Sequence, residues 1–239
     1  MICKLFVVFV SGLLVSIALL GSAWTLGGRQ VLQREGHGWH IDFDGDEAKG
    51  PRATRTLAFD GGKPLTIDGP VQLRFTRGTR SEMTVEGPKP VVDRLHWENG
   101  RLTLKGRRSW GDDDVEVTIT APVLAGLELN GASDVELKGL DQPELSVDAH
   151  GAVDLDANGK VRKLVINSRG AGNIDLENVD AEDAVIDVAG VGNVDISASG
   201  SVDARIAGAG NISLHRRPRK LTSEISGVGS VDHDYPGSE

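Results

Sequence analysis

Between residues 54 and 120, apolar and polar side chains alternate in short runs. Typical runs are LTI at 65–67, VQLRF at 71–75 and VEVTI at 115–119, and Gly, Pro or Asp residues separate them. A period of two residues places every second side chain on the same face of an extended strand. No stretch after residue 26 shows a helical period. The sequence therefore predicts an all-β fold.

From residue 121 the alternation becomes a repeat of 18–20 residues. Each copy contains a glycine followed by Ala or Val, with mostly apolar or small residues two, four and six positions before it. Apolar residues also stand four and six positions after it in most copies. The runs GAGNIDL (170–176), GVGNVDI (190–196) and GAGNISL (208–214) are close copies. We predict that the repeated glycines form structural turns; they are Gly131, Gly151, Gly170, Gly190, Gly208 and Gly227.

Repeats of this length are typical of solenoids. Coils stacked at about 4.8 Å by parallel pairing enclose a narrow continuous core that a single coil cannot form. We expect a right-handed parallel β-helix or related solenoid of about six coils, with the small residue after each glycine inside a corner. A hexapeptide helix would place an apolar residue at every sixth position. A nonapeptide calcium roll would repeat its glycine motif twice per coil. Neither pattern is present.

The N-terminal residues predict export. An uncharged, mostly apolar run at 5–26 follows Lys4 and is long enough to cross a bilayer. We therefore expect a signal peptide or signal anchor at 1–23, the only membrane contact, in a bacterial protein of the periplasm or cell surface. The predicted organisation continues with a polar linker at 24–52, a solenoid domain at 53–233 and a tail at 234–239. Residues 53–120 would cap or begin the solenoid, and 121–233 would form its coils.

Composition narrows the function. The net charge is −9, which makes nucleic acid a poor partner. The single cysteine, Cys3, lies in the N-terminal segment, so the exported part has neither a disulfide nor a thiol. Aromatic residues form only 4% of the chain, and the core must therefore be mainly aliphatic.

Polar residues recur at fixed distances from the glycines. Asn173, Asn193 and Asn211 stand three positions after a glycine, where short polar side chains bond the backbone of turns, and they could form an amide ladder. Asp156, Asp175 and Asp195 stand five positions after it and would face outward. We interpret them as part of a solvated acidic face that discourages sheet association. The alternative is a stripe that binds Ca²⁺ or a cationic ligand, although no metal-ligand set is apparent.

A dense basic run lies between the fifth and sixth copies, and it consists of His215, Arg216, Arg217, Pro218, Arg219 and Lys220. It is either a solvated connecting loop or a contact for an anionic glycan, lipopolysaccharide or lipid headgroup. A nucleophile elbow, a zinc-binding helix, a phosphate loop and a Cys/His pair are all missing from the sequence. We therefore expect no enzymatic activity and no cofactor.

The runs APVLAGLELNGASDVEL (121–137), SRGAGNIDL, VAGVGNVDI, GAGNISL and ISGVGSVD resemble a known family of bacterial envelope proteins. It is the putative auto-transporter adhesin, head GIN domain family. LTIDGPVQLRFTRG, MTVEG and NGRLTLKG are similar to the N-terminal half of that family, so the resemblance covers about 54–233. The resemblance implies a β-helical exported domain, and it supplies no catalytic or binding residues.

Together these features favour a non-enzymatic module that binds a glycan or another envelope surface component, as an adhesin does. A second hypothesis is a structural element that forms homo-oligomers by stacking open coils end to end. A carbohydrate-active enzyme on a β-helix is a third, because two outward carboxylates could meet in a groove.

Overall fold

A computed structural model describes residues 51–104 and 115–235. The expected signal peptide or anchor at 1–23, nearly all of the linker at 24–52 and the tail residues 236–239 lie outside the described residues. Within the described ranges, none of the helices has the length and apolar character needed to cross a membrane.

The N-terminal half forms short strands and one helical turn, α2, which is the exception to the expected all-β fold. Pro at the start and buried Val91 and Val92 fix this turn against the strands. Strand β3 pairs in parallel with the first repeat strand, whereas β1 and β4 pair antiparallel at the N-terminal end. The elements are β1 (Arg52–Ala58), β2 (Leu65–Ile67), β3 (Val71–Arg77), β4 (Glu82–Pro88), α2 (Lys89–Val92), β5 (Leu95–Glu98), β6 (Arg101–Leu104) and β7 (Glu116–Ala121).

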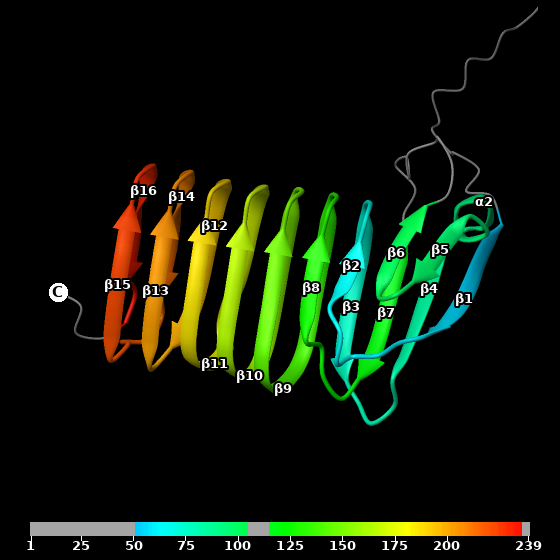
Figure 1. Cartoon of the computed structure of the whole chain (residues 1–239), viewed down its shortest axis with the longest axis horizontal. Helices are drawn as coiled ribbons and strands as arrows, with labels where there is room; N and C mark the ends of the chain where they lie inside the picture. Colours follow the sequence, from blue (N-terminus) through cyan, green and yellow to red (C-terminus); the bar gives the residue numbers. More distant parts are fainter. Residues whose placement is uncertain (1–50, 105–114, 236–239) are drawn as a thin grey trace, which may run out of the picture. The chain divides into compact units, whose positions relative to one another are not determined.

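The repeat forms parallel strands that stack along one axis (Figure 1). Three of these strands are long because each one ends one coil, bends and begins the next. The elements are β8 (Gly126–Leu129), β9 (Ser133–Ala149), β10 (Val153–Ser168), β11 (Ala171–Val188), β12 (Val191–Ala198), β13 (Ser201–Ile206), β14 (Ala209–Leu214), β15 (Lys220–Ile225) and β16 (Val228–His233).

Each repeat glycine joins two faces of the solenoid. We call the strand segments before the glycines the first face and those after them the second face. The glycine turns form the upper edge in Figure 1, and the bends that lead from the second face to the next first face form the lower edge. Residues equivalent in the repeat lie side by side in neighbouring coils, as Leu155 and Ile174 do. The expected parallel β-solenoid is therefore confirmed.

The expected number of coils is slightly too high, because the solenoid has about five turns. The prediction counted six repeat glycines. A complete turn runs from one glycine to the next, so six glycine turns enclose five full windings. The flanking strands β8 and β16 each belong to a turn that the repeat does not complete.

The core is a narrow aliphatic stack between the two faces. In one coil Leu164 and Ile166 of the first face meet Ile174 and Leu176 of the second, and all four are at most 2% exposed. Each such side chain contributes about 1.5–3 kcal/mol when fully buried. The alternation therefore places the core as predicted.

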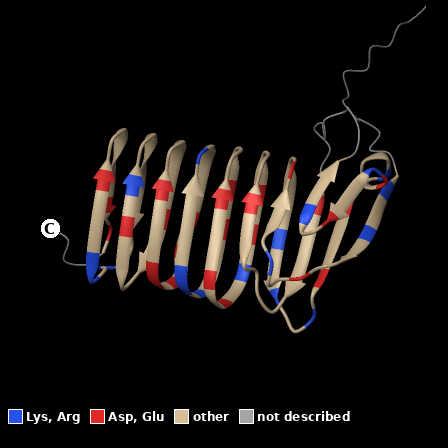
Figure 2. Cartoon of the chain, in the orientation of Figure 1, with Lys and Arg blue, Asp and Glu red and all other residues tan. Residues whose placement is uncertain are grey.

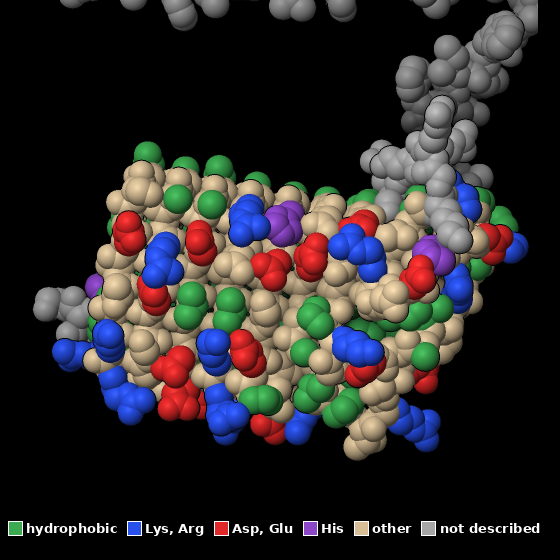
Figure 3. All heavy atoms as spheres, in the orientation of Figure 1, with side chains coloured by type: hydrophobic (Ala, Val, Ile, Leu, Met, Phe, Trp, Pro, Cys, Tyr) green, Lys and Arg blue, Asp and Glu red, His purple; other side chains and the backbone are tan. Residues whose placement is uncertain are grey.

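The residue after each glycine does not lie inside a corner, so this expectation is wrong. All six of these residues are exposed, including Val191 at 60% and Val228 at 78%. They project outward, whereas the glycine before each of them packs against the glycine of the neighbouring coil. Apolar side chains therefore line the upper edge, where Figure 3 shows them. The six residues are Ala132, Ala152, Ala171, Val191, Ala209 and Val228.

Candidate functional site

The repeat glycines form a column at the upper edge, and close packing of the backbone explains them. A side-chain carbon on Gly151, Gly170 or Gly190 would overlap the carbonyl of the preceding glycine in the column. In four of the turns the residue after the glycine donates its N–H to that carbonyl, as Val191 does to Gly170 at 2.9 Å. Gly131, Gly208 and Gly227 continue the column, and Gly69 of the β2–β3 turn begins it. These glycines let neighbouring turns pack closely against one another.

The three predicted asparagines lie outside on the second face, one coil apart. Asn193 donates an amide hydrogen bond to the side chain of Asn173 at 3.2 Å. Asn211 instead accepts bonds from the backbone and hydroxyl of Ser230. The amide ladder is thus limited to one pair, and Asn211 bonds the next turn at Ser230 instead.

The outward aspartates also stand in register, Asp156 beside Asp175 and Asp175 beside Asp195. Two of them have partners. Asp175 accepts the N–H of Glu177, and Asp195 lies 3.3 Å from the ring of His215. In the described part of the chain, no group of three or more acidic, His or Cys side chains could hold a metal ion.

The basic run is a loop that docks on earlier coils. Arg216 pairs with Asp180, Arg219 lies 3.7 Å from Glu182, and His215 lies between Asp195 and Glu177. Backbone bonds fix the loop as well, because the N–H of Arg219 reaches the carbonyl of Ser199 and that of Lys220 reaches the carbonyl of Gly200. Two of its four Arg and Lys side chains therefore pair with carboxylates of the same chain. Arg217 makes no ion pair with any residue of the described ranges.

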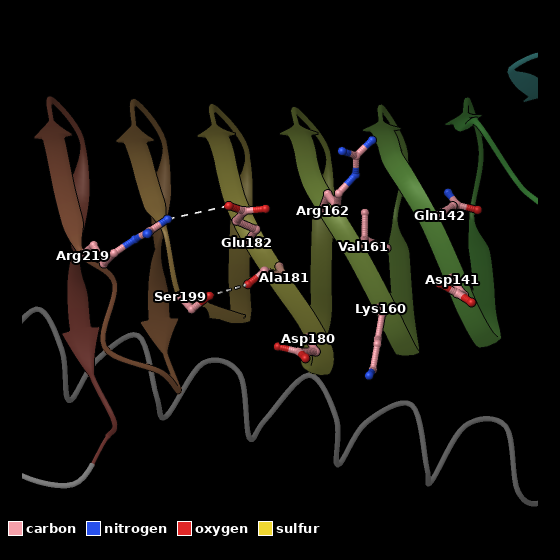
Figure 4. Close-up of a pocket in the computed structure, with 10 residues that line it drawn as sticks. All are labelled: Asp141, Gln142, Lys160, Val161, Arg162, Asp180, Ala181, Glu182, Ser199 and Arg219. Atoms are coloured by element: carbon pink, nitrogen blue, oxygen red, sulfur yellow. Dashed lines mark hydrogen bonds and ion pairs between the residues drawn. The ribbon is translucent and has the colours of Figure 1, made fainter.

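An open groove of about 650 Å³ runs along the lower edge, and we call it the lower-edge groove (Figure 4). It crosses five successive coils, because each bend contributes one to three residues. Both signs of charge gather along this edge in Figure 2. The lining residues are Asp141, Gln142, Lys160, Val161, Arg162, Asp180, Ala181, Glu182, Ser199 and Arg219.

The charges of the lower-edge groove are unevenly paired. Asp141 pairs with Arg77 at 2.9 Å, and Asp180 and Glu182 pair with the basic loop. By contrast, Lys160 and Arg162 form no ion pair with any residue in the described ranges, and Figure 4 shows both side chains extending freely from β10. The groove therefore offers a ligand two cations, together with polar lining side chains such as Gln142 and Ser199.

Sequence reasoning missed the lower-edge groove, except for Arg219, which it placed in the basic run. The groove residues stand in the stretches between repeats, where coil length varies and the register shifts near Ala157 and Gly159. One signal was present, since charged residues recur at 160–162 and 180–182 at the repeat spacing. No glycine motif marks them.

A cluster in the first coils was also missed. Arg101 donates to both carboxylate oxygens of Asp68, at 2.6 and 2.8 Å, and Asn130 bonds both Asp68 and Glu128. The hydrogen bond to Asp68, with that carboxylate's charge, raises the pKa of Arg101 above its ordinary value. This cluster ties β6 to the turns beside β2 and β8, which makes it structural.

Comparison with known proteins agrees with this architecture. A putative adhesin from Bacteroides fragilis NCTC 9343 has a TM-score of 0.62 and 21% identity, and the match covers 77% of this chain and 97% of that one. At this identity the likeness shows the fold alone. A putative lipid binding protein and a putative adhesin, both from Parabacteroides distasonis ATCC 8503, have TM-scores of 0.44 and 0.42 and identities of 16% and 17%, with the same coverage. No curated protein matches the chain.

The sequence itself carries the family relationship. A family model described as "Putative auto-transporter adhesin, head GIN domain" matches residues 63–218, from the strands before the repeat to the basic loop. The matched segment includes the glycine column up to Gly208 and nearly all of the lower-edge groove. This chain therefore belongs to the putative auto-transporter adhesin, head GIN domain family.

Proposed function

We propose that this chain is an exported, non-enzymatic envelope protein that binds a glycan or another surface component along its lower-edge groove. The observation that carries the proposal is the pair of cations, Lys160 and Arg162, without an ion-pair partner among the described residues of a groove that spans five coils. An extended ligand could contact successive coils at intervals of about 4.8 Å. The adhesin description of the family supports a binding role.

The chemistry of the groove favours a polymer that carries hydroxyl and acidic groups. The carboxylate or phosphate of such a ligand would accept charge-assisted hydrogen bonds from Arg162 and Lys160. Its hydroxyls could donate to Glu182 and to the backbone near Ser199. The groove has no aromatic residue in its lining, so recognition would depend on polar contacts.

In the sequence, the basic loop is a candidate for direct contact with an anionic ligand. In this proposal the loop instead forms part of the groove wall. Its Arg216 is held by Asp180, so the loop does not present a row of unpaired cations. Only Arg219 reaches the groove, where it forms one wall beside Glu182. Neutralising the loop should therefore reshape the groove wall, which would weaken binding indirectly.

The test is a binding screen of the full chain against envelope polysaccharides, lipopolysaccharide and anionic lipid vesicles. For a component that binds, Lys160→Glu with Arg162→Glu should lower affinity at least tenfold, because each bond to a charged group contributes about 1.5–3 kcal/mol. The matched control is Lys163→Glu, which changes a neighbouring cation that lies outside the groove and pairs with Glu144. Equal affinity of all variants would contradict the groove as the site.

Export and the absence of catalysis are parts of the same proposal. N-terminal sequencing of the protein from its own cells would distinguish a cleaved signal peptide from a retained anchor at 1–23. Incubation with each bound polysaccharide would reveal any hydrolysis as new reducing ends. Steady release of reducing ends that depends on a groove carboxylate would replace the binding proposal with an enzymatic one.

A further inference from the structure

The C-terminal end of the solenoid leaves the core open. Inward positions that are at most 1% exposed in the preceding coil, such as Ile206 and Ile212, become partly or fully exposed in β15 and β16. Ile225, which lies beside Ile206, is 44% exposed, and Leu221 and Val231 are half-buried. Among the described residues nothing pairs with the outer edges of these two strands. Such an edge is a template for a further strand.

The N-terminal end differs because it is covered. Leu57 of β1, Val91 and Val92 of α2, and Leu95 of β5 are all buried there. The antiparallel strands β1 and β4 also end the parallel stack. Since, among the described residues, only one end of the solenoid exposes its core, association through ends should join like with like and stop at two copies.

We propose that two copies of this chain join through their C-terminal ends into a closed two-fold dimer, with β15 against β15 and β16 against β16 in antiparallel pairs. The dimer goes beyond the proposed binding function and does not depend on it. The two-fold axis would run perpendicular to the faces, so the lower-edge grooves of the two copies would lie on opposite edges.

The positions around the last glycine permit one axis to serve both strand pairs. Ser223 stands four residues before Gly227, and Val231 stands four residues after it. Both positions are inward, because they lie beside the buried Ala204 and Ile212. Since both are four residues from Gly227, we place them at the same height on the two faces. An axis through Ser223 of both copies therefore also passes between their Val231 residues.

The side chains that would meet in this pairing are complementary. Around Ser223, Leu221 of one copy lies opposite Ile225 of the other, which covers the exposed core with apolar side chains. Lys220 lies diagonal to Glu224 of the other copy, within reach of an ion pair. In β16, Val231 meets its own counterpart. No pair places like charges directly opposite each other.

The segment before β1 fits this edge less well. Outside the described ranges and the N-terminal apolar run, residues 39–43 have the alternating pattern of a strand. The chain from Phe43 to Arg52 spans at most about 32 Å. An added strand would lie ten sheet steps from β1, which is about 48 Å.

A disulfide tests the pairing in the full-length chain. With Cys3→Ser as background, Ser223→Cys should give a reducible dimer under mild oxidation. Residues directly opposite in antiparallel strands have Cα atoms about 4.5–5.5 Å apart, which is within disulfide range. We expect most of the folded protein to cross-link. Adding Ile225→Lys should abolish the dimer, because it places two like charges in the apolar contact.

Two controls make the result decisive. Val191→Lys adds the same charge at an exposed apolar site away from the end, and it should leave the cross-link unchanged. Thr56→Cys on β1, mixed with Ser223→Cys, should give no mixed dimer. A mixed dimer would show head-to-tail stacking and overturn the closed dimer.

The main experiment can also contradict the proposal. If Ser223→Cys fails to cross-link while its circular dichroism spectrum is unchanged, the closed dimer is overturned. That result would fit a C-terminal end that another segment covers.

Discussion

The backbone carbonyl of Gly170 occupies the place where a side chain on Gly190 would begin. The two residues are equivalent in neighbouring coils, and the same overlap recurs along the column. Neither residue has a left-handed backbone conformation. Glycine is therefore required here by the approach of one turn to the next and not by the dihedral angles of the turn.

Replacing Gly190 with Ala should destabilise the solenoid by about 1–3 kcal/mol, because the new methyl group must push two turns apart. Thermal unfolding followed by circular dichroism would show this as a lower midpoint. The control is Gly62→Ala, where the new carbon would meet only the carboxylate of Asp60, at 3.3 Å. Equal midpoints for the two variants would contradict the role of the glycine column.

Inward side chains of the central coils should tolerate truncation less well than outward side chains of the glycine turns. Ile186 is fully buried, so Ile186→Ala should lower the free energy of unfolding by about 2–5 kcal/mol. Val228 is 78% exposed, and Val228→Ala should change the free energy of unfolding by less than about 0.5 kcal/mol. Urea denaturation of both variants provides the comparison. A similar loss from both would mean that another molecule or segment covers Val228.

Gln142 should stabilise the bend within β9 through its side-chain amide. Its Oε1 accepts the N–H of Leu124 at 2.9 Å, and its Nε2 donates to the carbonyls of Leu124 and Glu144 at 2.7 and 2.8 Å. Gln142→Ala should reduce the free energy of unfolding by about 1–3 kcal/mol, because it leaves buried backbone groups unpaired. The exposed Gln72→Ala is the control, and an equal effect in urea denaturation would refute this assignment.

The docked basic loop should contribute little to stability at high salt. Arg216 and Arg219 are well exposed in their ion pairs, so each pair contributes at most about 1 kcal/mol. The double variant Arg216→Ala/Arg219→Ala should lower the unfolding midpoint slightly at 10 mM NaCl. It should match the wild type at 1 M NaCl, where the Debye length falls to about 3 Å. Arg217→Ala should have no effect at either concentration, and a salt-independent loss in the double variant would argue against docking by charge.

The repeat was visible in the sequence because it depends on local chemistry. Alternation at 164–166 and 174–176 identified the inward side chains, and Gly170 marked the turn between them. The outward position of Ala171 was not predicted, because a small side chain fits on either the inside or the outside of a turn. Only the neighbouring coil shows that the glycine position has no room for a side chain.

The groove and the basic loop depended on contacts between coils. Residues 215–220 form a dense run of cations in the sequence, but Asp180 and Glu182, which neutralise two of them, lie in an earlier coil. Conversely, Lys160 and Arg162 are inconspicuous among nearby charges, yet they are left without ion-pair partners among the described residues. Pairing across coils depends on where the bends fall, and the variable coil lengths hide this from the pattern.

The sequence by itself determined the class of fold, the inward rows and the positions of the turns, because period-two alternation and recurring glycines are properties of neighbouring residues. The tertiary structure decided which charges are neutralised, where the lower-edge groove opens and which end of the core is uncovered. These features arise from residues about one coil or more apart, which only stacking at about 4.8 Å brings into contact.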